Sequence, residues 1–595
     1  MKTTFHTIVI GTGCAGYHAA ERLYKLGVTD IAILTEGRLM GTSRNTGSDK
    51  QTYYKLSLCG DDGDSVRELA STLFAGGAVN GDTAFCEATY SVRCFMHLVE
   101  LGVPFPTNEL GEYVGYKTDH DPRSRATSCG PLTSQKMTQV LEQEVERLGI
   151  PLLDGYRAVK LLTDENGIVG VAALDTRGFP TVFTCANVVL ATGGPAGVYA
   201  RTVYPESQSG ATGLALEAGA KATNLDQWQY GLASTAFRWN VSGTYQQVLP
   251  RYISVDAEGN EYEFLPNAFG NAAEALDMVF LKGYQWPFDS AKLNGSSRVD
   301  LFVEEEIRKG RRVYMDFCHN PQGLEEGFAA LGAEAKQYLE NSEALFGTPI
   351  ERLQKMNAAA IQLYADHGID ITREPLEVAV CAQHCNGGVA VDANWQSTVL
   401  GLYVVGEAAG TFGVARPGGS ALNAAMVGSL RAAEHIAAAN RSIPKNAAAY
   451  TLPNIRRGES SVAAWRESFC TRMSRVAAFD RNISEMQTLF TEATALRDSF
   501  FETMTATGPS ELISVFLFYD ILCTQCAVLS AMLCSGQKIG SHGSALVDKK
   551  PPLPFSAPRD TQTITQGEES YLSPVRPLPN PDTWFERVWR AQQNK

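Results

Sequence analysis

A glycine-rich turn between an apolar strand and a helix, near the start of the chain, is the feature that most constrains the fold. Residues 7–10 form a β-branched run, residues 15–26 have helical periodicity, and Gly11, Gly13 and Gly16 lie where the two meet. In this spacing the first glycine permits a tight turn, the second lets a pyrophosphate approach the backbone, and the third lets the helix pack on the strand. The helix N-terminus then faces the phosphates. The pattern therefore predicts a Rossmann-type fold that binds a dinucleotide.

The segments that follow extend this pattern. A second strand over residues 31–34 is followed by Glu36, about 20 residues after Gly16, where a carboxylate accepts hydrogen bonds from an adenosine ribose. Two later strands, over residues 187–190 and 402–405, lead into turns of the same kind. Parallel strands that feed ligand-binding turns are typical of an α/β fold with a doubly wound sheet.

Nicotinamide and flavin cofactors share this fingerprint, and the later part of the chain distinguishes between them. Glu407 follows its strand in a turn that flavoproteins use to close over the ribityl chain and the pyrophosphate. Gly419 and Ser420 then precede a helix of small residues over 424–439, which aims its amides at the flavin pyrimidine edge and stabilises the charge of reduced flavin. The sequence therefore predicts FAD. The residues expected to bind it are Gly11, Gly13, Gly16, Glu36, Ser43, Thr192, Gly193, Gly194, Gly406, Glu407, Gly419, Ser420 and Leu422.

Composition limits the other functional classes. The net charge of −14 argues against a non-specific nucleic-acid partner, which would require a basic face. No stretch has the roughly 20 apolar residues of a membrane span, and no secretory signal precedes the first strand, so we expect a cytoplasmic protein. Cys523 and Cys526 have no second cysteine pair beside them, so they are expected to be buried small side chains and no metal site is expected.

Changes of pattern divide the chain into five segments. Residues 1–240 and 375–445 are expected to form the two parts of the FAD-binding domain, and residues 241–374 a domain of mixed α+β pattern inserted between them. Residues 446–545 contain three long helical stretches, at 461–477, 483–503 and 509–535, as in a helical bundle. Residues 546–595 are proline-rich and predict a linker, or an arm laid over a neighbouring surface.

With these motifs, the chain resembles the flavoprotein subunits of succinate dehydrogenase and fumarate reductase, with L-aspartate oxidase and adenylylsulfate reductase as relatives. The resemblance reaches to about residue 548. His384, followed by Gly387 and Gly388, resembles a His-x-x-Gly-Gly segment whose histidine contacts a substrate carboxylate. Arg416 matches the arginine that pairs with the other carboxylate, a geometry that suits its planar fork. The resemblance also implies that residues 241–374 are a capping domain. The alternative for His384 is a histidine that is hydrogen-bonded in a loop beside the sheet, but its match to Gly387 and Gly388 and its position before the Glu407 turn favour the active-site role.

Two positions depart from the family in the substrate region. The family's Gln-Phe-His-Pro-Thr segment corresponds to residues 229–233, where Gly231 replaces the histidine and Ala233 the threonine. Leu301 occupies the place of the arginine that protonates the substrate in fumarate reductases, and Arg298 lies one helical turn earlier. Arg298 is therefore a candidate proton donor, with a solvated arginine at a helix start as the alternative. Asp49, Lys50, Tyr53 and Tyr54 would lie near the flavin if the correspondence holds, or form a polar turn.

These residues predict hydride transfer between flavin N5 and a small organic substrate that carries a carboxylate or carbonyl. Arg416 and His384 would polarise it, and the reaction expected first is reduction of an activated C=C bond in an enoate or enone other than fumarate. Gly231 and Ala233 are expected to enlarge the pocket and to remove polarity.

Three alternatives stay open: a dehydrogenase or oxidase of amino or hydroxy acids, flavin-adduct chemistry as in adenylylsulfate reductase, and a flavoprotein that only relays electrons within a complex. No second Rossmann fingerprint or cluster motif occurs in the sequence, so a separate electron-transfer protein is expected as a partner.

We expect FAD to be bound non-covalently, so acid or heat should release it intact. In relatives with covalent flavin a histidine after the second strand forms the bond, and residues 40–53 contain no histidine. The measurement is flavin fluorescence of the denatured chain after gel separation, with chromatography of the released cofactor. Fluorescence that stays with the polypeptide would contradict this prediction, and release of FMN would contradict the ribose role of Glu36.

Overall fold

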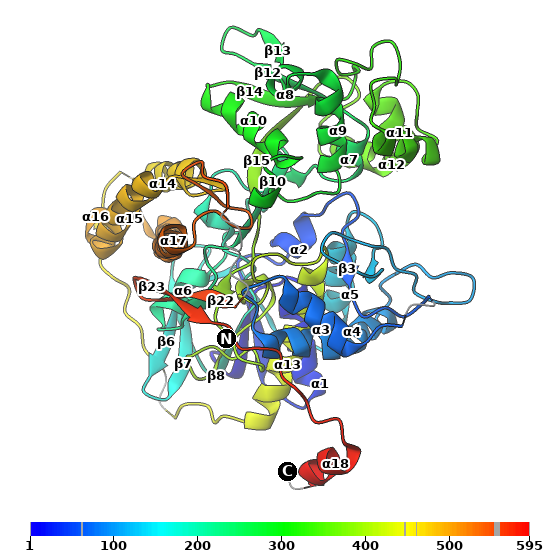
Figure 1. Ribbon diagram of the computed structural model, residues 1–595. Helices are drawn as coiled ribbons and strands as arrows, with labels where there is room; N and C mark the ends of the chain where they lie inside the picture. The colour runs from blue at the N-terminus through cyan, green and yellow to red at the C-terminus, as the bar shows by residue number, and fades with distance from the viewer. Residues whose placement is uncertain (1, 61–62, 446–447, 460, 553–559, 594–595) are drawn as a thin grey trace.

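The computed structural model describes residues 2–60, 63–445, 448–459, 461–552 and 560–593. A seven-stranded sheet lies at its centre (Figure 1), in the order β5 (Leu152–Asp154), β2 (Ile31–Thr35), β1 (Thr4–Ile10), β8 (Pro180–Leu190), β7 (Gly167–Asp175) and β6 (Tyr156–Asp164), with β17 (Leu402–Val404) also paired to β8. Strands β5, β2, β1, β8 and β17 are parallel, and β7 and β6 add an antiparallel edge. The predicted α/β fold with a Rossmann-type sheet is confirmed.

The register of this sheet brings the turns at the strand ends together. Ile10 lies opposite both Leu34 and Leu190, and Val404 lies opposite Leu190. Strands β1, β2, β8 and β17 therefore end at the same edge. Helix α1 (Cys14–Lys25) starts at that edge and packs against α13 (Ser420–Ala439). A Cβ atom at Gly16 would overlap the carbonyl of Gly11, so only glycine allows α1 to lie this close. Ligand-binding turns are thus gathered along one edge, as the switch point of a doubly wound sheet requires.

A second sheet lies above this edge (green in Figure 1), and the sheet and its helices are called the capping domain below. Its order is β11 (Trp239–Asn240), β10 (Trp228–Ser234), β15 (Leu376–Cys385), β14 (Arg312–Asp316), β12 (Arg251–Val255) and β13 (Glu261–Glu263). Its helices are α7 (Thr244–Gln247), α8 (Leu265–Phe269), α9 (Ala272–Lys282), α10 (Ser297–Arg308), α11 (Ala333–Asn341) and α12 (Pro349–Asp366). Strands β11, β10 and β15 lie outside residues 241–374, so the sheet extends past the predicted limits of the insert. These limits stay a prediction.

The helical stretches predicted after the second part of the FAD-binding domain are confirmed as helices. They are α14 (Val462–Val476), α15 (Ile483–Asp498), α16 (Phe500–Thr503) and α17 (Leu512–Lys538). By length and composition the helix at Pro509–Lys538 could cross a membrane, but 72% of its most apolar window is buried within the protein, as expected of a core helix. Cys523 and Cys526 lie on α17 as buried free thiols, as predicted.

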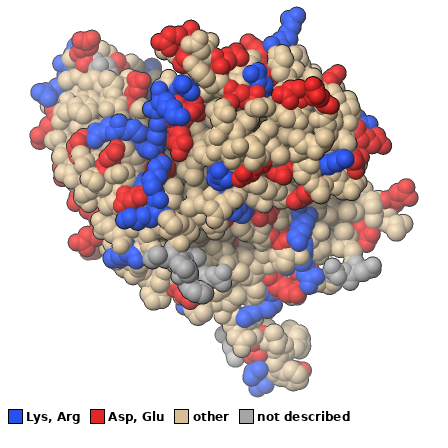
Figure 2. All heavy atoms as spheres, turned by 45° about the horizontal axis from the view of Figure 1, so that its top comes forward, with Lys and Arg blue, Asp and Glu red and all other residues tan. Residues whose placement is uncertain are grey.

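The proline-rich tail contains more structure than its composition suggested. Strands β22 (Thr561–Gln566) and β23 (Glu569–Pro574) form a hairpin, and β22 pairs with β9 (Ala222–Thr223), which in turn pairs with β16 (Gly388–Val389). The hairpin therefore joins the tail to segments far away in the sequence. Beyond it, α18 (Phe585–Gln593) projects from the body (Figure 1), and Figure 2 shows acidic and basic side chains intermingled on the face it displays.

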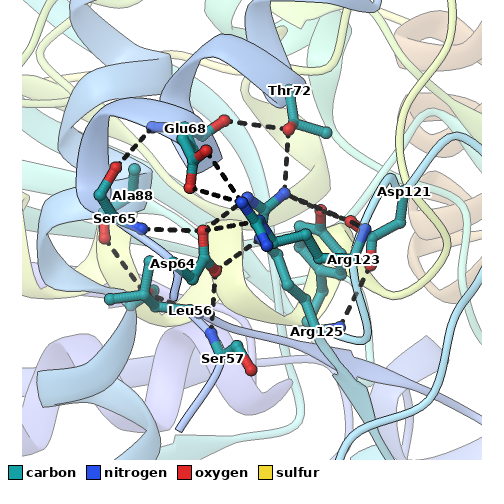
Figure 3. Close-up of polar contacts among 12 residues, drawn as sticks. Leu56, Ser57, Asp64, Ser65, Glu68, Thr72, Ala88, Asp121, Arg123 and Arg125 are labelled. Carbon is teal, nitrogen blue, oxygen red and sulfur yellow. Dashed lines mark hydrogen bonds and ion pairs between the residues drawn. The ribbon is translucent and has the colours of Figure 1, made fainter. Parts of the chain in front are cut away.

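A buried guanidinium fixes the segments beside the sheet edge (Figure 3). Arg125 donates to both carboxylate oxygens of Asp64, at 2.8 and 2.7 Å, and to Asp121 at 3.2 Å, Tyr54 at 3.1 Å and Thr72 at 2.9 Å. The side chains of Arg125, Asp64 and Asp121 are at most 1% exposed. This network connects helix α3 (Val66–Ala75) to the paired strands β3 (Tyr53–Tyr54) and β4 (Ala126–Thr127), next to the loops at 48–52 and 116–119.

Replacing this guanidinium should destabilise the fold far more than replacing its exposed neighbour. For Arg125→Met we expect the free energy of unfolding to fall by about 3–5 kcal/mol, because two buried carboxylates lose their partner. The matched control is Arg123→Met, which removes a partly exposed pair with Glu68 and a longer contact of 3.9 Å with Asp64, and it should cost at most about 1 kcal/mol. Urea unfolding at pH 7 measures both, and equal losses would contradict the account.

The difference in the free energy of unfolding between wild type and Arg125→Met should depend on pH. Burial alone would raise the pKa of Asp64, but hydrogen bonds from Arg125 and from the Ser57 amide outweigh burial and lower it. A carboxyl group whose pKa is lower in the folded chain than in the unfolded chain stabilises the fold. This contribution is complete above the pKa of the unfolded chain, about 4, and is lost as the pH falls below that pKa. The difference between wild type and Arg125→Met should therefore be largest near pH 7 and shrink as the pH falls, because protonation first relieves the unpaired carboxylates of the variant and then removes the contribution of Asp64 in wild type.

Candidate active site

A cavity of about 980 Å³ lies between the edge of the central sheet and the capping domain. Of the residues predicted to bind FAD, the structure places these in its wall: Gly11, Gly13, Glu36, Ser43, Thr192, Gly193, Gly406, Glu407, Gly419 and Leu422. The predicted residues Gly16, Gly194 and Ser420 lie next to the wall and are not part of it. Their roles in cofactor binding stay a prediction.

The start of helix α1 has the properties of a phosphate site. Gly13 is its N-cap and gives no side-chain cap, and the Cys14 amide donates to Ser43 Oγ at 3.3 Å. The hydroxyls of Thr42 and Thr192 also line the cavity and are buried without a hydrogen-bond partner. Uncapped helix amides beside unpaired hydroxyls fit a pyrophosphate, which would satisfy both.

The part of the cavity where the adenosine is expected to bind contains an ion pair that the sequence did not reveal. Arg157, on β6, donates to Glu36 Oε2 at 2.7 Å and to Ser209 Oγ at 3.2 Å, and all three residues line the cavity. The guanidinium thus orients the carboxylate expected to hold the ribose. Arg157 follows Tyr156 in an ordinary strand pattern, so no local motif marks it.

The N-terminus of α13 faces the other half of the cavity. Its N-cap is Gly419, at φ +90°, where a side chain would be strained and would overlap Thr52. No side chain caps the helix, and Ser420 Oγ is buried without a partner. Free amides at the start of a 20-residue helix favour a negative charge, as predicted for the flavin pyrimidine edge.

The structure brings Arg416 and His384 together in the cavity wall. Arg416 Nη2 donates to Gln229 Oε1 at 2.9 Å, and Arg416 Nε is buried with no hydrogen-bond partner in the part of the chain that the structure describes. Burial lowers the pKa of Arg416 to about 10, so its charge is retained at neutral pH. It forms no ion pair with a carboxylate in the described part of the chain, although the charge of Glu407 acts on it and partly offsets the effect of burial on its pKa. A partly buried cation of this kind favours an anionic ligand.

His384 faces this arginine as a neutral ring in a defined tautomer. Its Nδ1 lies 2.9 Å from Asn386 Oδ1, and Asn386 is oriented because its Nδ2 donates to the Val414 carbonyl at 3.2 Å. Nδ1 therefore carries the proton, and Nε2, which is buried and has no hydrogen-bond partner among the described residues, has a free lone pair. Burial, with the charge of Arg416, holds the pKa of His384 well below its usual value.

Glu407 lies next to this free nitrogen. Its Oε1 accepts hydrogen bonds from the Tyr204 hydroxyl and, at 2.9 Å, from the Cys385 amide, and it is 3.8 Å from His384 Nε2. Burial raises the pKa of Glu407 to about 7. The carboxyl group therefore exchanges a proton near neutral pH, a property typical of catalytic acids and bases.

The expectation of an enlarged pocket at Gly231 is wrong. The indole of Trp286, from the capping domain, packs over Gly231, where a Cβ atom would overlap it, and Trp286 lines the cavity. Ala233 is buried among apolar side chains and is not in the wall. Glycine is thus present because a large neighbour fills the space, and the wall here is aromatic.

The structure does not bring Arg298 to the cavity. Its guanidinium pairs with Glu274 at 2.6 Å and lies over the Phe269 ring at 4.4 Å from the centroid. Leu301 is partly buried against the core. Because α10 presents these residues to its own domain, Arg298 is corrected from candidate proton donor to a structural arginine of the capping domain.

An acidic side chain connects the loop after α2 (Thr42–Asn45) to the capping domain. Asp49 accepts hydrogen bonds from the Thr244 hydroxyl at 2.7 Å, from the Thr244 amide at 3.2 Å and from Asn357 Nδ2. Asp49 and Lys50 line the cavity, whereas Tyr53 and Tyr54 are buried outside it. Asp49 is therefore placed to hold the cap over the cavity.

Known proteins match this chain over most of its length. Residues 6–422 match the family model described as FAD binding domain. L-aspartate oxidase of Streptomyces coelicolor is 26% identical over 447 residues, which cover 73% of this chain and 68% of that protein. A polypeptide of the CoM/CoB fumarate reductase of Methanothermobacter marburgensis is 25% identical over 562 residues, covering 90% and 93%. The structure of FrdA of Escherichia coli quinol fumarate reductase shares the fold, with a TM-score of 0.71 at 19% identity over 99% of both chains.

Breaking the Asp49 contact should open the cap. We expect Asp49→Asn to raise flavin accessibility, measured as iodide quenching of flavin fluorescence, because the hydrogen bonds to Thr244 and Asn357 stabilise closure by about 1–3 kcal/mol. Thr244→Val removes the hydroxyl donor without touching the cavity wall and should give an increase in the same direction, but a smaller one, because the Thr244 amide and Asn357 still donate to Asp49. In the double variant the effects should not add. Unchanged quenching in Thr244→Val would contradict a role in closure.

Proposed function

The chain belongs to the family that shares this FAD binding domain, and we propose that it reduces the activated C=C bond of an enoate or enone held between Arg416 and Trp286. It is an FAD-dependent oxidoreductase, and the predicted resemblance to fumarate reductase and aspartate oxidase is confirmed by its relatives. The proposal depends on one observation: Arg416 lines a cavity that Trp286 also lines, and among the described residues it has no carboxylate within ion-pair distance.

FAD, when bound, supplies the hydride chemistry, and the residues of this chain bind, orient and protonate. Arg416 would hold the carboxylate or carbonyl of the substrate through the unpaired Nε–H and its neighbouring N–H groups. The same contact stabilises the enolate-like charge that develops when the β-carbon is reduced. The arginine therefore acts in both binding and activation.

His384 and Glu407 would replace the arginine that fumarate reductases use as proton donor. Glu407, with a pKa of about 7, holds a proton for part of the time near neutral pH. His384 Nε2 can accept it and pass it to the substrate carbon, because the ring is neutral and its lone pair is free. The 3.8 Å between Nε2 and Oε1 exceeds a hydrogen bond, so transfer requires a small movement.

The aromatic wall determines which substrates fit. Trp286 occupies the region where a polar partner for a second carboxylate would be, and Phe280 also lines the cavity. An unpaired carboxylate against an indole would be costly to desolvate. We therefore infer a substrate with one anionic or carbonyl group and a flat apolar remainder, such as a 3-arylacrylate, and not fumarate.

A second candidate function is supported by the tautomer of His384. A neutral ring with a free Nε2 is suited to take a proton from a 2-hydroxy or 2-amino acid whose carboxylate is held by Arg416. That reaction runs in the oxidising direction. Oxygen consumption or dye reduction with a panel of such acids distinguishes it from enoate reduction.

Electron supply, attachment of the cofactor and cellular location belong to the same proposal. We infer a separate electron-transfer protein as partner, non-covalent FAD and a cytoplasmic location. The first inference is supported by relatives whose names place them within larger complexes, such as the fumarate reductase polypeptide of Methanothermobacter marburgensis.

The test uses purified holoenzyme, reduced viologen and two substrates. A 3-arylacrylate should be reduced, and fumarate should turn over well below about 1 per second, the lower end of ordinary enzyme rates. Arg416→Lys should raise the activation barrier of arylacrylate reduction by about 2–4 kcal/mol. Turnover should then fall roughly 30- to 1000-fold, with FAD content unchanged.

The matched control for Arg416→Lys is Arg298→Lys, which alters an arginine outside the cavity and should leave turnover within about twofold. Efficient fumarate reduction, or a loss in Arg298→Lys as large as in Arg416→Lys, would contradict the proposed site.

A further inference from the structure

Three side chains with metal-ligand chemistry meet away from the cavity, in the core of the FAD-binding domain. His18 and Glu21 are three residues apart on α1, and His97 is on α4 (Gly81–Glu100). One potential ligand atom from each lies within 4.8 Å of the others. None of the three is part of the cavity wall, so they play no part in the proposed oxidoreductase function.

His18 has a free lone pair in a buried position. The side chain is 1% exposed, and its Nδ1 has no hydrogen-bond partner among the described residues. The Met426 carbonyl accepts a hydrogen bond from the ring, and Nε2 must be the donor because Nδ1 has no partner. A ring held in this way, by a carbonyl on its far nitrogen, is typical of histidines that bind metal through the other nitrogen.

Glu21 and His97 complete the set. The Glu21 side chain is fully buried, and its Oε2 lies 3.4 Å from His97 Nε2, which has no hydrogen-bond partner. The cluster therefore offers two imidazole nitrogens and one carboxylate.

We propose that His18 Nδ1, His97 Nε2 and a carboxylate oxygen of Glu21 form a site for a divalent metal of borderline softness, with zinc as the preferred ion. Two imidazoles and a carboxylate suit zinc, and they leave a fourth position for water. His97 is 14% exposed and gives the ion a path from solvent. The metal would join α1, whose first turn faces the cofactor cavity, to α4.

Arg22 is the competitor for this site. Its guanidinium donates to both oxygens of Glu21, and its side chain is 17% exposed. Lys25 lies 3.9 Å from Glu21 and pairs more closely with Glu144, at 3.1 Å. A metal ion would displace one Arg22 contact, and the guanidinium can turn toward solvent. Removing Arg22 should therefore strengthen metal binding, whereas a purely structural cluster would gain nothing from it.

The experiment treats purified holoenzyme with a chelator, reloads it with zinc alone, and measures bound zinc by mass spectrometry and the unfolding temperature. Wild type should retain about one zinc per chain and unfold at a higher temperature with zinc than without it. His97→Gln should bind at least about tenfold more weakly, and Arg22→Met more tightly than wild type. The control is His435→Gln, whose ring contacts Tyr403 and which should behave as wild type.

Wild type that retains no zinc after reloading would overturn the proposal, and this result requires no variant. Zinc that binds equally to wild type and His97→Gln would also overturn it, because the ion would then lie elsewhere. FAD content, recorded on every sample, distinguishes a lost metal site from a misfolded variant.

Discussion

No side chain fits between helix α1 and the turn before it, and the geometry of the cavity follows from this constraint. A Cβ atom at Gly16 would overlap the Gly11 carbonyl, so glycine lets the helix start directly at the strand ends. The uncapped amides of α1 and of α13 then face one cavity from two sides. One end of the cavity is suited to phosphates and the other to a reduced flavin, as helix N-termini favour negative charge.

The capping domain determines what else can enter. Trp286 fills the space beside Gly231, and Asp49 joins the loop below to the start of α7. Between these contacts, Arg416 faces the cavity beside the neutral His384. Residues from different segments, which meet only in the folded chain, are thus assigned to bind an anion, to orient it and to move a proton.

The sequence predicted local features well and cross-domain contacts poorly. The glycine turn, the strands that follow it and the helices after residue 460 are encoded by local periodicity, and the structure has them. The prediction of an enlarged pocket at Gly231 was wrong because a glycine in a sequence does not indicate which neighbour fills the space beside it. That neighbour, Trp286, is 55 residues away in the sequence. Arg298 was misplaced because helical spacing fixes a face but not what that face packs against. The pairing of β22 with β9 was missed for the same reason, since it joins segments about 340 residues apart.

The central claim is that one carboxylate binds at Arg416 while the rest of the substrate lies against Trp286. An experimental structure of the oxidised holoenzyme with a bound 3-arylacrylate tests it most directly. The account predicts carboxylate oxygens about 2.7–3.2 Å from the Arg416 guanidinium, with the ring of the ligand in contact with the indole. A carboxylate bound instead at Lys50, or an indole displaced to admit a second anionic group, would contradict it.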